Sequence, residues 1–170
     1  MRTAVAVVAL VALAGSAVAQ PKGEYVSDAG AYKVRFPDKP KVSTPTTKTA
    51  VGELKVTIAT YANADGSIYL VSHSDYPATA TKPENHATLL AGVRDGMKGS
   101  DALVGTELEF AFGTDKFPAR EFVLDKNKQR IKVRLILSGG RLYQLAAIGT
   151  ETFVKSKDVT VFLDSFEITK

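Results

Sequence analysis

Residues 130–149 read R-I-K-V-R-L-I-L-S-G-G-R-L-Y-Q-L-A-A-I-G, two apolar-rich runs on either side of a glycine pair. Glycine takes positive φ at little cost, so Gly139 and Gly140 predict a two-residue hairpin turn in which both have φ > 0. Counting outward gives the pairs Leu137–Leu142, Leu135–Gln144, Val133–Ala146 and Ile131–Ile148 on one face. The other face then holds Ile136–Tyr143, Arg134–Leu145 and Lys132–Ala147. Both faces carry apolar side chains, so we expect both to be covered, by helices.

The rest of the chain alternates between strand and helix patterns. Strands are predicted at 31–36, 41–51, 54–59, 67–75, 103–112 and 117–125. A helix is predicted at 81–98, where Thr81 and Glu84 have capping-box spacing, and a second at 156–165 with Ser156 as N-cap. This order predicts one α+β domain, residues 20–170, with a single, largely antiparallel β-sheet packed between helices as an α/β/α sandwich.

Composition excludes several kinds of protein. The chain has 170 residues, 45% of them hydrophobic, and a net charge of +4, which is too mild for the basic surface of a nucleic-acid binder. It contains no cysteine, which removes disulfides, thiolate catalysis and cysteine-based zinc sites. We therefore expect no cofactor of that kind and no nucleic-acid partner.

The first nineteen residues have the pattern of a secretory signal peptide. Arg2 provides the positive charge, residues 4–14 are an unbroken apolar run, and residues 17–19 read A-V-A, a small-x-small cleavage pattern. The apolar run is too short for an ordinary transmembrane helix of about 20 residues. The sequence thus predicts cleavage after residue 19, export to the periplasm or the extracellular space, and no stable membrane span afterwards.

Four motifs, taken together and in this order, resemble a known group of proteins. They are G-A-Y-K-V-R-F-P at 30–37, F-P-A-R-E at 117–121, G-R-L-Y-Q-L at 140–145 and F-L-D-S-F-E-I at 162–168. The chain resembles small exported bacterial proteins of unknown function whose fold is similar to PsbP, an extrinsic subunit of the photosynthetic oxygen-evolving complex. The resemblance implies a central antiparallel sheet between helices. It carries over no catalytic residue, cofactor or partner, because its motifs are structural.

Two histidines and one acid are the candidate metal ligands. His73 and Asp75 lie two residues apart on one predicted strand and share a face, whereas Ser72 and Ser74 point the other way, which makes a catalytic triad geometrically poor. His73, Asp75 and His86 could bind a metal if the start of the first helix approached this strand. Their spacing matches no known metal motif, so ordinary polar roles are the alternative.

A basic row with nearby acids is the candidate ligand-binding site. With a short turn near Asn127, Glu121 faces Lys132 or Arg134, and Arg120 falls in the same row as core residues. One interpretation is an anion pocket formed by Arg120, Glu121, Lys132 and Arg134. The alternative is cross-strand ion pairs, each worth less than about 1 kcal/mol. Gln144, inside an apolar row, is interpreted as a hydrogen-bonded buried amide rather than a ligand contact.

These observations favour an exported, non-catalytic binding or structural module that recognises a protein partner or an envelope component. The alternatives are a hydrolase or metal-dependent enzyme that uses His73, Asp75 and His86, and an anion-binding protein that uses the basic sheet face.

Overall fold

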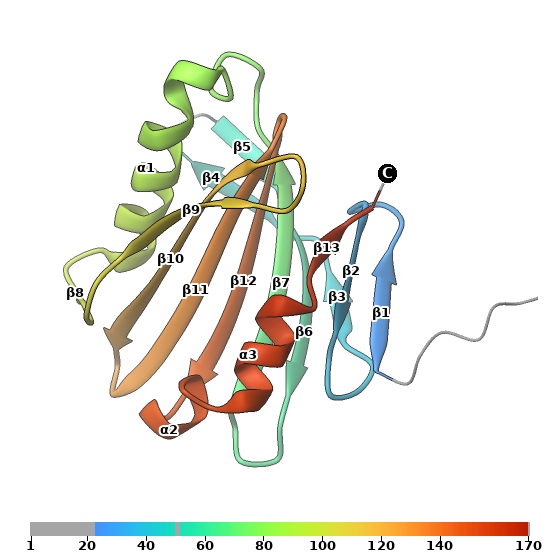
Figure 1. Ribbon diagram of the computed structural model, residues 1–170, viewed down its shortest axis with the longest axis vertical. Helices are drawn as coiled ribbons and strands as arrows, with labels where there is room; N and C mark the ends of the chain where they lie inside the picture. The colour runs from blue at the N-terminus through green and yellow to red at the C-terminus, as the bar shows by residue number, and fades with distance from the viewer. Residues whose placement is uncertain (1–22, 50–51, 170) are drawn as a thin grey trace, which may run out of the picture.

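The computed structural model describes residues 23–49 and 52–169 (Figure 1), so the predicted signal peptide at 1–19 lies outside the described residues. Its main element is an eight-stranded antiparallel sheet. Seven of the strands follow the order β3-β6-β7-β12-β11-β10-β8, and the eighth, β9, pairs with β10. The strands are β3 (Lys41–Ser43), β6 (Thr57–Ala62), β7 (Ile68–Asp75), β8 (Ala102–Leu103), β9 (Leu108–Phe112), β10 (Phe117–Lys126), β11 (Gln129–Ser138) and β12 (Arg141–Gly149).

The glycine-pair hairpin is present in the predicted register. β11 and β12 pair Leu137 with Leu142 and Leu135 with Gln144, and the count continues to Arg130 with Gly149. One detail of the turn differs from the prediction: Gly139 has φ +57°, whereas Gly140 does not have positive φ. A turn with positive φ only at its first central residue is of type II′, which also matches the twist of paired strands.

A second two-residue turn connects β10 with β11. Asn127 and Lys128 have φ of +53° and +64°, as a type I′ turn requires, and asparagine tolerates this region better than most residues. The turn places Glu121 opposite Arg134, one of the two partners that the sequence predicted.

The two faces of the large sheet are covered differently. One face packs against α1 (His86–Lys98), which follows a short 3₁₀ helix, η1 (Pro83–Asn85). The core on this face is formed by Leu90, Phe122, Leu124, Val133, Leu135, Leu137, Leu142 and Ala146. The other face packs against α2 (Glu151–Val154), α3 (Lys157–Asp164) and a three-stranded sheet, β1-β2-β13. The strands of that small sheet are β1 (Glu24–Ser27), β2 (Tyr32–Arg35) and β13 (Glu167–Ile168).

The expectation of a single sheet between helices is therefore corrected. The fold is α+β and its sheets are antiparallel, but the described residues form three sheets and few helices, so the protein is richer in strands than the expected sandwich. The tail after α3 pairs with β2, which creates the second sheet. The third sheet is the hairpin of β4 (Thr46–Thr49) and β5 (Gly52–Lys55).

Three predicted strands are each divided in two. The first breaks at Pro45, which has no N–H to donate to a ladder, and the chain leaves the large sheet there to enter the β4–β5 hairpin. The chain returns to the large sheet at Val56, whose N–H donates to the carbonyl oxygen of Pro45. The strand predicted at 103–112 is divided into β8 and β9 around Gly105, which has φ +72°.

Of the two predicted N-terminal helix caps, one is wrong and one is confirmed. The Thr81–Glu84 capping box is absent, because Thr81 bonds to the carbonyl oxygen of Pro77 and the first turn is 3₁₀ rather than α. At α3, Ser156 is the N-cap and accepts a hydrogen bond from the N–H of Val159, as predicted.

Candidate functional site

The structure divides the four residues of the predicted anion pocket between the two faces of the sheet. Glu121, Lys132 and Arg134 face α3, whereas Arg120 lies on the α1 side with Phe122, because neighbouring residues of a strand point to opposite faces. The four side chains therefore cannot line one pocket together.

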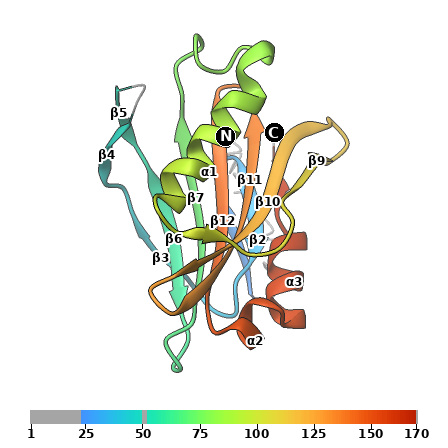
Figure 2. The same cartoon turned by 90° about the vertical axis from the view of Figure 1, so that its left-hand side faces the viewer.

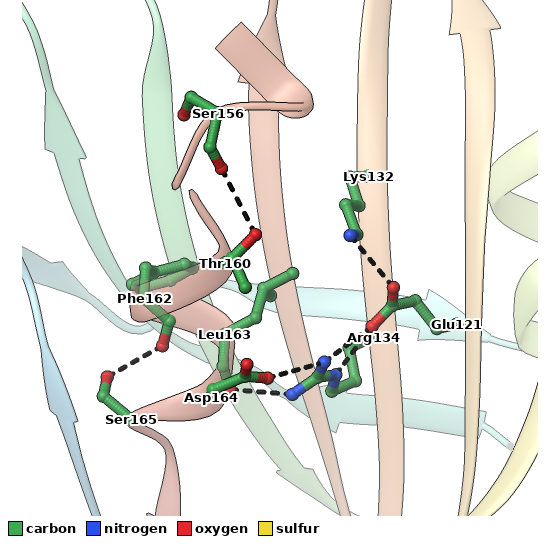
Figure 3. Close-up of polar contacts among 9 residues, drawn as sticks. All are labelled: Glu121, Lys132, Arg134, Ser156, Thr160, Phe162, Leu163, Asp164 and Ser165. Carbon is green, nitrogen blue, oxygen red and sulfur yellow. Dashed lines mark hydrogen bonds and ion pairs between the residues drawn. The ribbon is translucent and has the colours of Figure 1, made fainter. Parts of the chain in front are cut away.

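Arg134 connects the large sheet to the C-terminal end of α3 (Figure 3). Its Nε donates to Glu121 Oε2 at 2.8 Å, its Nη1 donates to the carbonyl oxygen of Leu163 at 2.8 Å, and its Nη2 contacts Asp164 Oδ1 at 3.1 Å. Lys132 Nζ lies 3.1 Å from the other carboxylate oxygen of Glu121. A guanidinium satisfies the free carbonyls and the partial negative charge at a helix C-terminus. This geometry favours the ion-paired alternative over an anion pocket.

Arg120 is the centre of a second ionic cluster, on the α1 side. It is only 5% exposed, and its guanidinium contacts Glu107 and Glu109, while Glu107 also pairs with Arg94 of α1. These partners explain how a charged residue can lie in a core row. The sequence analysis missed Arg94, Glu107 and Glu109. Counting from the turn between β9 and β10 would have placed Glu109 opposite Arg120.

The candidate metal ligands are engaged separately. His73 is 6% exposed, and its ring packs against Tyr32 and Tyr143 at centroid distances of 5.9 and 6.4 Å. Asp75 accepts two hydrogen bonds from Arg141, at 2.6 and 2.9 Å, which lower the pKa of the carboxyl group. His86 Nε2 lies 3.0 Å from the carbonyl oxygen of Thr81. Residues 23–49 and 52–169 contain no group of three histidine, cysteine or acidic side chains that could hold a metal ion.

A groove between α1 and the β4–β5 hairpin is the candidate binding site. Figure 2 shows the hairpin beside α1, near the edge of the large sheet. The groove has a volume of about 710 Å³, within the roughly 300–1,000 Å³ typical of small-molecule sites. From α1 it is lined by Thr88, Leu89, Gly92, Val93, Gly96 and Met97. Residues 47–49 of β4 form another part of the wall, together with Tyr76 and Gln144.

The groove exists because α1 covers the sheet incompletely. Of the residues of α1, all of which the structure describes, Leu90 alone is buried. Leu89, Val93 and Met97 are half-buried and line the groove. Gly92 and Gly96 lie one turn apart on the same side, and a Cβ added at either would meet nothing within 4 Å. The two glycines therefore leave open space where side chains would otherwise fill the gap to the hairpin.

Gln144 is not the satisfied amide that the sequence suggested. It is half-buried, lines the groove, and its side chain forms no hydrogen bond with the described part of the chain. The groove is open to solvent, so water can bind this amide and a polar ligand atom can replace that water. This makes Gln144 a candidate ligand contact, the role that the sequence analysis had disfavoured.

Comparison with known proteins identifies the fold. No family model and no curated protein matches this chain. Among solved structures, it is similar to the solution structure of cyanobacterial PsbP (CyanoP) from Synechocystis sp. PCC 6803, with a TM-score of 0.53 and 13% sequence identity. The match covers 91% of this chain and 98% of that chain. The chain thus has a PsbP-like fold, as its motifs predicted, and at this identity the likeness concerns the fold alone.

Proposed function

We propose that this protein is an exported, non-catalytic binding module whose binding site is the groove between α1 and the β4–β5 hairpin. The observation that carries this proposal is the groove itself, which is largely apolar, open and of small-molecule size, with the amide of Gln144 unbonded in its wall. A site of this kind holds the apolar part of a partner or envelope component without acting on it chemically.

The ionic clusters elsewhere support a structural role for Arg134 and Arg120. Arg134 is occupied by Glu121, Asp164 and the end of α3, and Arg120 is occupied by Glu107 and Glu109. His73, the natural candidate for a general base, is enclosed by aromatic rings. Among the described residues that line the groove there is, by comparison, neither a histidine nor an acidic residue.

Export is proposed from the signal-peptide pattern of residues 1–19, which lie outside the described residues. No helix in the described part of the chain is both long and apolar enough to cross a membrane. Detection of the mature chain, beginning at Gln20, in the exported fraction would test this part of the proposal, and recovery of the uncleaved chain in the cytoplasm would contradict it.

The binding site is tested with N-phenyl-1-naphthylamine, a neutral apolar dye whose fluorescence rises in apolar surroundings. We expect saturable binding to the folded protein, and loss of that binding in Gly92→Leu, which places a side chain in the open space of the groove. The matched control is Ala87→Leu, which adds the same side chain to an exposed position of α1 that does not line the groove. Equal binding by both variants, or no binding to the wild type, would overturn the proposal.

A further inference from the structure

The two edges of the large sheet differ in how well they could pair with another strand. At one edge, β3 has three residues, begins with Lys41 and lies between Pro40 and Pro45. Proline lacks an N–H, and lysine and proline on a short strand discourage edge pairing. At the other edge, β9 has five residues, L-E-F-A-F, and in the described part of the chain it pairs with β10 alone. The β9 edge is therefore open to a further strand.

The free backbone groups of β9 belong to Glu109 and Ala111. Ala111 pairs with Pro118, which has no N–H, so this is not a hydrogen-bonded pair. Hydrogen-bonded and non-hydrogen-bonded pairs alternate along antiparallel strands, so the Glu109–Arg120 pair is of the same kind. The N–H and C=O groups of Glu109 and Ala111 thus point away from β10, and both residues are exposed.

One face of β9 is apolar along its whole length, because Leu108, Phe110 and Phe112 share it. The guanidinium of Arg134 lies 5.6 Å from the centroid of the Phe110 ring, and Phe112 packs against Phe166 at a centroid distance of 5.9 Å. Leu108 is 57% exposed, more than any other large hydrophobic side chain in the described part of the chain. The apolar row of β9 therefore reaches the surface at Leu108.

The sequence of β9 is complementary to itself when two copies run antiparallel. With Phe110 opposite its own copy on a two-fold axis, Glu109 of each copy pairs with Ala111 of the other through the free backbone groups. Leu108 then faces Phe112, and no charge faces a like charge. A register centred on Glu109 would oppose two carboxylates, which is unfavourable, and one centred on Ala111 would leave Leu108 beyond the end of the facing strand.

We infer that two copies of this protein pair antiparallel through β9, centred on Phe110, and so join their large sheets into one. A second copy is the occupant because β9 itself supplies the apolar residues and the uncharged position that its own edge requires. The contact leaves the groove free, since β9 and the β4–β5 hairpin lie on opposite sides of α1 (Figure 2). This inference is independent of the proposed function.

Sedimentation equilibrium of the purified protein measures the association. We expect a monomer–dimer equilibrium without larger species, because a two-fold contact closes on itself. Ala111→Pro removes the free N–H of the edge and should keep the pairing with β10, which does not use that N–H. It should weaken the dimer by at least about tenfold, because each copy loses a donor to the other.

A second pair of variants tests the apolar contact. Leu108→Lys should also weaken the dimer, because it places a charge opposite Phe112 of the other copy. The matched control is Val42→Lys on β3, where the valine is 51% exposed, and it should leave the dimer unchanged. N-phenyl-1-naphthylamine should bind equally to all of these variants.

Single cysteines test the register, because the chain has no cysteine of its own. The Cα atoms of a non-hydrogen-bonded pair lie about 4.5 Å apart, within reach of a disulfide. Phe110→Cys should therefore form an intermolecular disulfide on mild oxidation. Leu108→Cys should not, because its two copies lie about 13 Å apart in this register.

A protein that stays monomeric up to the highest soluble concentration would overturn the inference and leave the edge to a strand of another protein. Unchanged association in Ala111→Pro, or equal effects of Leu108→Lys and Val42→Lys, would place the contact on another surface and overturn it as well. Assemblies that grow with concentration would show an open rather than a two-fold contact. Equal cross-linking by the two cysteine variants, or cross-linking by Leu108→Cys alone, would exclude the register centred on Phe110.

Discussion

Arg134 donates a hydrogen bond from Nη1 to the carbonyl oxygen of Leu163, 2.8 Å away, and thereby joins the middle of β11 to the last turn of α3. The same guanidinium holds the carboxylate of Glu121, which is only 18% exposed. Removing Arg134 would leave a half-buried carboxylate with Lys132 alone and a helix-terminal carbonyl without its partner. Buried polar groups that lose a partner destabilise more than the net strength of the bond suggests.

Arg134→Met should therefore lower the free energy of unfolding by about 2 kcal/mol, measured by urea denaturation. The control is Arg130→Met on the same strand, where the arginine pairs with the more exposed Asp125 at 3.2 Å and the loss should stay below about 1 kcal/mol. If both variants lose the same free energy of unfolding, Arg134 contributes no more than a surface ion pair does and does not hold α3 to the sheet.

The open space beside Gly92 and Gly96 leads to a prediction about stability. Both glycines have helical backbone inside α1, and a Cβ at either meets nothing within 4 Å. Gly92→Ala and Gly96→Ala should each raise the free energy of unfolding by about 0.5–1 kcal/mol, because alanine loses less backbone entropy than glycine on forming a helix. Thermal denaturation measures the gain.

Gly149 provides the opposite case and serves as the control for alanine substitution. A Cβ there would lie 2.7 Å from Phe153 Cδ1 and 3.0 Å from Ser67 Cβ, so Gly149→Ala should destabilise the protein. If Gly92→Ala and Gly96→Ala also destabilise, the space beside α1 is filled in solution and the groove is not open.

The sequence predicted the central hairpin because its register depends only on a local turn. A two-residue turn fixes every pair by counting, and the alternation of apolar residues then assigns the faces. The second sheet could not be predicted by counting from a turn. Glu167 pairs with Lys33, more than a hundred residues away, and neither short strand has a local pattern that indicates its partner. That long-range pairing is what replaces the expected all-helical cover.

The candidate site could not be predicted from the sequence for a related reason. The groove depends on the distance between the β4–β5 hairpin and α1. Tertiary packing sets this distance, and no periodic pattern in the sequence indicates it. The two glycines of α1 were visible, but a glycine inside a helix is equally compatible with close packing. Gln144 was noticed as a polar residue in an apolar row, and only the structure shows that its amide faces a groove.

His73 should make the stability of the protein depend on pH. Burial, followed by the charge of Arg141, lowers the pKa of His73, while Asp75 opposes this effect. The unfolded chain therefore takes up a proton at His73 at a higher pH than the folded chain does. The free energy of unfolding should be highest above about pH 6.5 and should fall as the pH decreases below it, by at most about 1.4 kcal/mol per pH unit from this group.

Urea denaturation of the wild type and of His73→Gln between pH 7.5 and 5.5 measures this dependence. Glutamine does not titrate, so the variant should show a shallower decrease over this range, whatever its stability at pH 7.5. Identical slopes for the two proteins would mean that protonation of His73 is not linked to unfolding, and that the ring is more accessible to water than its packing against Tyr32 and Tyr143 indicates.

The cluster around Arg120 gives a prediction in which a second substitution repairs the first. Arg120→Met removes the charge that faces Glu107, whose side chain is 16% exposed, and leaves that carboxylate with Arg94 alone. We expect a loss of about 2–4 kcal/mol in the free energy of unfolding, because a buried charge that loses its partner is strongly destabilising. Adding Glu107→Leu removes the stranded charge and fills part of its volume, so the double variant should be more stable than Arg120→Met alone. A double variant whose loss equals the sum of the two single losses would show that the two side chains contribute independently, in which case the β9–β10 edge is held by apolar packing rather than by this ion pair.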